Sequence, residues 1–147
     1  MTPPSSALRP TAREQLRLRQ ASGASYGFLP EKVSGRLVKS MLEAGWIYGE
    51  DRDGYRLSDA DALGRVGAAR WKITSSGRWA ALTKVQRRAL LSLADGDGQD
   101  NGAGIPAAAV QVLVSYGLAA ASAPHVPVLR TSLGRRVVNA CATGQDT

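Results

Sequence analysis

The feature of this 147-residue sequence that most constrains its fold is an internal repeat. Residues 38–47 have the sequence Val-Lys-Ser-Met-Leu-Glu-Ala-Gly-Trp-Ile, and residues 71–78 have the sequence Trp-Lys-Ile-Thr-Ser-Ser-Gly-Arg. Related patterns recur at residues 110–119 and 128–135. The alignment pairs Gly45 with Gly117, Thr74 with Thr131, Gly77 with Gly134 and Arg78 with Arg135. One supersecondary unit is therefore expected to occur twice.

Each copy carries the same local signals. A periodic apolar helix ends at a Gly, which adopts the left-handed conformation without a side-chain clash, and an apolar strand follows at once. After a hairpin, the chain returns as a second strand that ends in Thr-Ser. A hydroxyl at that point can accept hydrogen bonds from the free amides of a helix that begins at Gly-Arg. The expected order in each copy is helix, strand, hairpin, strand and capped helix.

This order, with its Gly-Trp-Ile or Gly-Leu step and its Thr-Ser-x-Gly-Arg return, resembles the winged helix-turn-helix, especially the regulator branch that includes the MarR and PadR families. The resemblance covers most of the chain as two fused modules, and it implies an α+β fold that is mainly α, with small β-hairpin wings. We therefore expect a flexible tail at 1–10, a first module at 11–82, a second module at 83–141 and a tail at 142–147.

Composition favours a nucleic-acid partner. The formal net charge is +7 and the isoelectric point is about 10.2, which favours an acidic partner. Cys141 is the only cysteine, so the chain forms no internal disulfide and no thiolate metal cluster. The N-terminus lacks the apolar core of a signal peptide, and no apolar run approaches membrane-spanning length. We therefore expect a cytoplasmic protein.

The first helix is expected to start after Thr11, with Glu14 at capping-box spacing, and to run through Gln20. The charged residues near it are either a solvated face or a phosphate contact: Arg9, Arg13, Arg17 and Arg19. Residues 22–28 indicate a loop or one short helical turn. A standard winged helix has a distinct second helix there, so this segment departs from the pattern.

Residues 30–44 are predicted to form a helix with Pro30 in its first turn. The apolar face of this helix comprises Val33, Leu37, Val38, Met41 and Leu42. Its polar face comprises Lys32, Arg36, Lys39 and Ser40. The resemblance makes it the recognition helix, with the polar face in the major groove of DNA. The alternative is an ordinary amphipathic helix with a solvated charged face.

The resemblance makes residues 48–70 the first wing. The segment is long for a hairpin loop, and acids offset its arginines. A wing-tip arginine in the minor groove, steadied by an aspartate, is the role implied for Arg52 beside Asp51 or Asp53, or for Arg56. Residues 58–63 suit a short helix capped by Ser58, which would make the wing an interaction surface. The DNA contacts assigned to the wing and its return strand are Arg52, Arg56, Arg65, Arg70 and Lys72.

In the second module, Thr83 is expected to cap a helix at 84–94, followed by a loop at 95–104. The residues expected to face inward from this helix are Val85, Ala89, Leu90 and Leu93. Arg87 and Arg88 are expected to point elsewhere, as solvated side chains or as a second phosphate contact.

The helix at 106–116 has no basic residue and is apolar almost all round. This pattern indicates burial or an interface, either of a homodimer or with another protein partner. The second wing, at 120–128, is short and carries His125 in place of arginines. A final helix at 134–140 is expected to direct Val137, Val138 and Cys141 inward.

Catalytic and cofactor chemistry is not indicated. With His125 as its one histidine, the chain cannot build a multi-histidine metal site, and no catalytic triad is apparent around that residue. The glycine clusters match neither a dinucleotide-binding nor a phosphate-loop pattern. We therefore expect a non-enzyme without cofactor or metal. The first hypothesis is a double-stranded DNA-binding regulator of transcription or of a mobile element. The alternative is a winged-helix protein–protein adaptor that does not read DNA specifically.

Overall fold

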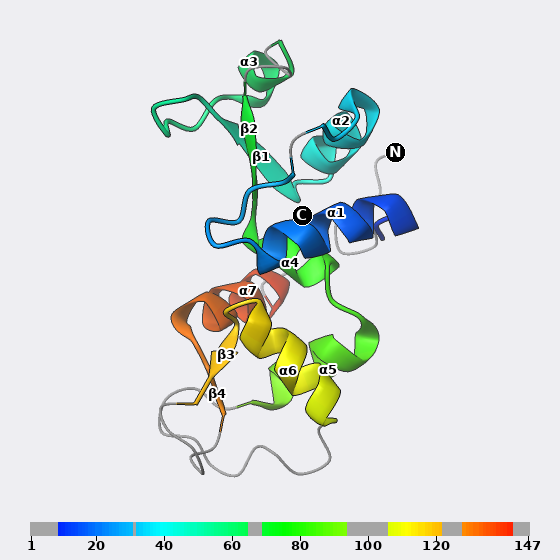
Figure 1. Cartoon of the computed structure of the whole chain (residues 1–147), viewed down its shortest axis with the longest axis vertical. Helices are drawn as coiled ribbons and strands as arrows, with labels where there is room; N and C mark the ends of the chain where they lie inside the picture. The colour runs from blue at the N-terminus through cyan, green and yellow to red at the C-terminus, as the bar shows by residue number, and fades with distance from the viewer. Residues whose placement is uncertain (1–8, 31, 65–68, 94–105, 122–127, 143–147) are drawn as a thin grey trace.

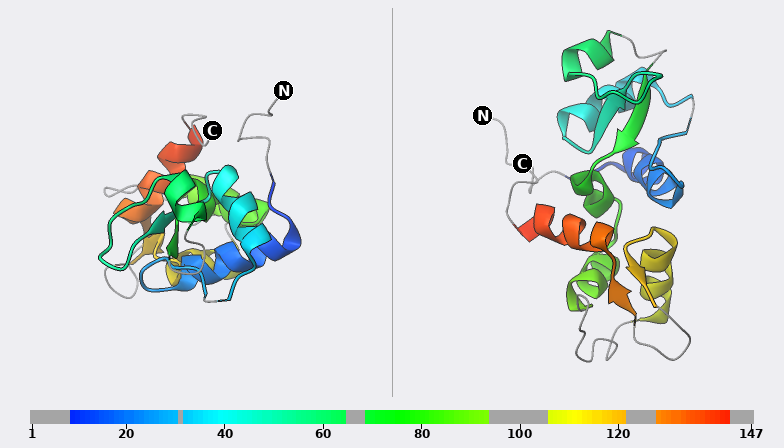
Figure 2. Two further views of the ribbon diagram at one scale, coloured as in Figure 1. Left: turned by 90° about the horizontal axis from the view of Figure 1, so that it is seen from above. Right: turned by 90° about the vertical axis from the view of Figure 1, so that its left-hand side faces the viewer.

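The computed structural model describes residues 9–30, 32–64, 69–93, 106–121 and 128–142. Within these ranges, two bodies are stacked along the long axis of the molecule (Figures 1 and 2). The elements of the first unit are α1 (Ala12–Gly23), α2 (Gly35–Glu43), β1 (Ile47–Glu50), α3 (Asp59–Leu63), β2 (Arg70–Ile73) and α4 (Ser75–Ala80). Those of the second unit are α5 (Lys84–Ser92), α6 (Ala107–Ser115), β3 (Ala119–Ala120), β4 (Leu129–Arg130) and α7 (Ser132–Ala142). Helices predominate and the described part of each unit has one two-stranded antiparallel sheet, so the expected α+β class is confirmed.

The helices α2 and α6 end in the same way, as the repeat predicts. Gly45 and Gly117 follow them with φ of +80° and +74°, in the left-handed region that favours glycine. In each case the next amide reaches back to close the last turn. These bonds run from Trp46 N to Met41 O at 3.0 Å and from Leu118 N to Leu113 O at 2.9 Å.

The return strand of each unit is tied to that helix end by a threonine. The hydroxyl of Thr74 donates to the Gly45 carbonyl at 2.7 Å and accepts from the amide of Gly77 at 3.0 Å. The equivalent bonds of Thr131, to Gly117 and from Gly134, are 2.6 and 3.1 Å long. The caps start α4 and α7 two residues earlier than the predicted Gly-Arg positions, because each threonine is the residue before the helix.

A glycine allows each closing helix to approach the first strand. A Cβ on Gly77 would clash with the carbonyl oxygen of Trp46, and a Cβ on Gly134 would clash with that of Leu118. Both carbonyls are bonded, to the amides of Thr74 and Thr131. The described residues therefore repeat one backbone arrangement in α2–β1–β2–α4 and in α6–β3–β4–α7.

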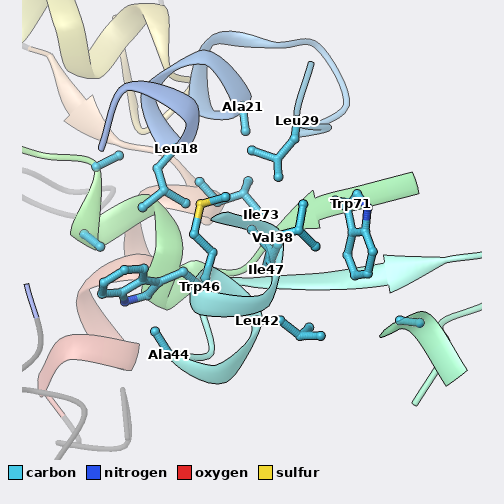
Figure 3. Packing of buried hydrophobic residues seen from close by; sticks show 14 residues of the cluster. Leu18, Ala21, Leu29, Val38, Leu42, Ala44, Trp46, Ile47, Trp71 and Ile73 are labelled. Carbon is cyan, nitrogen blue, oxygen red and sulfur yellow. The ribbon is translucent and has the colours of Figure 1, made fainter. Parts of the chain in front are cut away.

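Each unit has its own buried apolar cluster. In the first unit, Leu18 from α1 and Val38 from α2 converge on Ile47 and Ile73 of the hairpin (Figure 3). The second cluster begins at Leu82 and gathers the buried residues of α5, α6 and α7. Trp79 of α4 packs against the second cluster, whereas Ala80 and Ala81 belong to the first.

The C-terminal end of α4 joins the two units. Its last carbonyls accept side-chain hydrogen bonds from both sides, and cations are favoured at this negative end of the helix dipole. The bonds are from Gln15 to Ala80 O (3.5 Å), Arg19 to Ala81 O (3.1 Å) and Arg87 to Trp79 O (3.1 Å). Arg19 and Arg87 are thus used inside the fold. The expectation that Arg87 points into solvent or to a phosphate is wrong, since its guanidinium also lies 5.2 Å from the Trp79 ring centroid.

Three of the predicted helices have the caps that the sequence indicates. Thr11 with Glu14, and Thr83 with Gln86, each form a capping box. Ser58 caps the short helix α3 by accepting from the amide of Asp61. The prediction that Val85 faces the core is wrong, because its side chain on α5 is 50% exposed.

The predicted start of the candidate recognition helix is also wrong. The helix α2 begins at Gly35, five residues after Pro30, and Ser34 caps it by accepting from the amide of Leu37. The chain before α2 instead pairs with the sheet, and the amide of Leu29 donates to the carbonyl oxygen of Trp71 at 2.8 Å. Lys32 has φ of +67°, which is incompatible with a right-handed helix.

Candidate nucleic-acid interface

The exposed face of α2 carries two cations. Arg36 and Lys39 are three residues apart and exposed, whereas Val38, Met41 and Leu42 on the opposite face are buried in the first cluster. The core thus fixes which face of α2 meets solvent. Two of the three cations predicted for this helix, Arg36 and Lys39, are therefore exposed where an acidic partner could reach them.

The other two residues assigned to this face have different positions. Lys32 is exposed but lies in the turn before α2. The Ser40 hydroxyl donates to Glu14 Oε2 at 2.5 Å. Glu14 is 4% exposed, and its other carboxylate oxygen accepts from the amide of Thr11. Ser40 therefore ties α2 to α1, and its hydroxyl proton is already used.

The wing has an inserted hairpin of its own. Asp51 N donates to Tyr55 O at 2.9 Å, and Asp51 Oδ1 accepts from the amides of Asp53 and Tyr55 at 2.9 and 3.0 Å. Gly54, with φ of +87°, completes the turn. The Asp51 carboxylate shapes this turn, and Arg52 lies exposed within it.

The hairpin belongs to a wider sheet than its two strands indicate. Phe28 forms an isolated bridge with Lys72 of β2, and Lys72 pairs with Tyr48 of β1, so three segments of the chain contribute to one row. A second row joins Arg70, Glu50 and Arg56 in the same manner. Alternation along β2 turns Trp71 and Ile73 into the core and leaves Arg70 and Lys72 on the opposite surface, which we term the outer face.

Aromatic rings hold the cations of the outer face. The Arg56 guanidinium lies 4.4 Å from the Tyr48 ring centroid, and that of Arg70 lies 4.7 Å from the Phe28 ring centroid. The Lys72 ammonium is 5.6 Å from the same Phe28 ring. These separations are in the range of cation–π attraction, which orients the cations without neutralising them.

One acid lies within this surface. Glu50 is 8% exposed, and its carboxylate accepts from the Tyr48 hydroxyl at 3.3 Å. Burial raises the pKa of Tyr48, and the nearby Glu50 charge and hydrogen bond raise it further, while Arg56 acts in the opposite direction. Tyr48 is therefore a neutral hydrogen-bond donor at ordinary pH.

The structure thus separates the sequence-predicted contacts. Arg36 and Lys39 extend from a helix on the inner side of the sheet, and Arg56, Arg70 and Lys72 lie on its outer face. Arg65 lies outside the described residues. Sequence reasoning missed Phe28 and Tyr48 as partners of the cations. The alternation of residues 70–73 was the available signal for the outer face, but nothing local indicates that Phe28 pairs beside it.

The corresponding surface of the second unit is different. The helix α6 has no charged residue, and its exposed side chains include Ala107, Ala108, Gln111 and Val114. Its strands β3 and β4 pair over two residues each. His125 and most of the second wing lie outside the described residues, as does the Cys141 side chain.

Among the described residues, no group of three or more His, Cys, Asp or Glu side chains could hold a metal ion. No helix in the described part of the chain has the length and apolar character needed to span a membrane. The chain matches no known family model, no curated protein and no solved structure.

Proposed function

We propose that this chain is a double-stranded DNA-binding regulator built from two fused winged-helix modules, of which the first reads DNA. The observation that carries the proposal is the exposed pair Arg36 and Lys39 on α2, a helix whose other face is fixed by the core. The nine residues of α2 span about 13 Å, and the major groove admits a helix of this kind.

The residue types suit this role. Arg36 can make bidentate hydrogen bonds to a guanine edge or to a phosphate, and Lys39 supplies a point charge for phosphate. The exposed Arg52, in the turn at 51–55, would act as the wing contact. The net charge of +7 adds long-range attraction for DNA.

The helix α2 is held firmly enough to present those residues. No further helix lies between α1 and α2 in the described residues, and the hydrogen bond from Ser40 to Glu14 joins the two helices directly. Ser40 therefore acts as a positioning residue in this proposal. The departure from a standard helix-turn-helix is compensated by a direct contact between the helices.

The test is binding to labelled duplex DNA by fluorescence anisotropy across a salt series, with random sequences and with sequences from the neighbourhood of the gene. We expect the double variant Arg36→Ala, Lys39→Ala to lose about tenfold or more in affinity and to show a shallower salt dependence. The control Arg88→Ala, Arg135→Ala removes two exposed charges from the second unit and should lose much less. Equal losses in both variants would show that the chain binds DNA only through its overall positive charge. Unchanged binding by the α2 variant would refute the proposal.

A protein–protein adaptor is the second candidate, favoured by α6. This helix lacks charge and leaves Val114 44% exposed. Such a surface suits a homodimer or another protein partner. Light scattering distinguishes the two functions: a dimer that Val114→Asp dissociates, in a chain without duplex affinity, would favour the adaptor.

A further inference from the structure

The outer face of the sheet carries chemistry that duplex recognition by α2 does not use. Its six side chains come from four segments of the first unit: Phe28, Tyr48, Glu50, Arg56, Arg70 and Lys72. The apolar cluster lies between this surface and the exposed cations of α2. A duplex held by α2 would leave the outer face uncovered.

We propose that the outer face binds single-stranded nucleic acid, at a site separate from that of α2. Three cations face one buried carboxylate, so the surface has a positive balance that complements a phosphate backbone. The partners that the structure gives these cations are aromatic rings, and each ring lies within 6 Å of a cation. Charge and stacking surface thus occur at the same points.

Stacking identifies a single strand as the occupant. Unpaired bases expose their faces and stack on aromatic rings or on guanidinium planes, whereas a duplex hides those faces. Arg56 above Tyr48 and Arg70 above Phe28 form two such layered platforms. They stand on neighbouring strands of the sheet, so a strand crossing the sheet would meet them in succession.

The second unit offers no equivalent among its described residues. Its paired strands contribute only Ala119, Ala120, Leu129 and Arg130. Aromatic residues are absent from both strands. The site is therefore specific to the first unit, although the backbone arrangement is shared.

The experiment compares a labelled oligo(dT) strand with a labelled duplex in anisotropy titrations of the full chain. The variant Arg56→Gln, Arg70→Gln should weaken single-strand binding by about tenfold or more and change duplex affinity by less than about threefold. The charge-matched control Arg88→Gln, Arg135→Gln should leave single-strand binding nearly unchanged. The α2 variant Arg36→Ala, Lys39→Ala should lose duplex binding and retain the single strand, so failure of this inference and failure of the duplex proposal are distinguishable.

Stacking is tested with charge held constant. The variant Phe28→Leu, Tyr48→Leu should weaken oligo(dT) binding by about fivefold or more, because it removes both aromatic rings and leaves the charge unchanged. Photo-crosslinking of wild-type protein to a 5-iodouracil strand, read by mass spectrometry, needs no variant and should mark Phe28 or Tyr48. Absence of single-strand binding at low salt, crosslinks only to other segments, or equal losses in the outer-face and control variants would overturn the proposal.

Discussion

In the first unit, the helix that ends at Gly45 exposes Arg36 and Lys39, whereas the helix that ends at Gly117 in the second unit exposes no charged side chain. The backbone of the two units is nevertheless held by the same contacts. A left-handed glycine, a threonine bridge and a second glycine in close approach occur in both. The comparison shows that a few positions specify this arrangement, and the surface residues are free to differ.

The hairpins differ as strongly as the helices. Four residue pairs join β1 to β2, and Phe28 and Arg56 extend the sheet on either side. Two residue pairs join β3 to β4. The longer sheet creates the outer face, with its rings and cations, and the described residues of the shorter one form no such surface. The two units therefore share an architecture and differ in surface, and we propose that the first binds nucleic acid.

The largest expected effect tests the shared architecture. Gly77→Ala and Gly134→Ala should each destabilise the chain by at least about 3 kcal/mol, because the added Cβ meets a backbone carbonyl that cannot move independently. Urea unfolding followed by tryptophan fluorescence measures the change. Gly64→Ala is the control, since the nearest atoms to its Cβ would be 3.6 Å away. Tolerance of alanine at one of the two positions would show that the units are not equivalent.

An intermediate effect is expected at the threonine bridges. Thr74→Val and Thr131→Val keep the side-chain volume and remove a hydroxyl that both donates and accepts. Each should lower the free energy of unfolding by about 1–2 kcal/mol. Serine at either position retains the hydroxyl and should restore most of the loss. If Thr131→Val left the free energy of unfolding unchanged, only the first unit would depend on this bridge.

The smallest effect is expected at Tyr48, in the first unit, and concerns how stability depends on pH. The pKa of Tyr48 is raised in the fold, so its contribution to stability is complete below the ordinary tyrosine pKa of about 10 and is lost as the pH rises through the folded value. Tyr48→Phe should therefore lose less stability than wild type between neutral and strongly alkaline pH. Denaturation midpoints over that range provide the measurement. Burial also raises the pKa of Tyr116 in the second unit. Because wild type and Tyr48→Phe both contain Tyr116, the difference between their pH profiles comes from Tyr48. A parallel pH profile for the two proteins would contradict the assigned environment of Tyr48.

The features that sequence predicts well are those set by neighbouring residues. The capping box at Thr11, the cap at Thr83 and the left-handed glycines at 45 and 117 depend on contacts within a few positions, and all four are present. The predicted start at Pro30 failed because the segment before α2 pairs with β2, more than 40 residues away.

The candidate site was predicted in part for the same reason. Arg36 and Lys39 follow from helical periodicity, and they are exposed as expected. The stacking of Arg70 on Phe28 could not be predicted, because it depends on a sheet pairing between distant segments. The use of Arg87 at the end of α4 likewise depends on how two helices meet.

The most direct test of a DNA-reading first unit is chemical-shift mapping of the labelled full chain during titration with duplex DNA. We expect the amide shifts to concentrate in α2 and in the turn at 51–55, while α6, its counterpart in the repeat, stays unchanged. Shifts centred on α6, or spread evenly over both units, would contradict the assignment of DNA binding to the first unit.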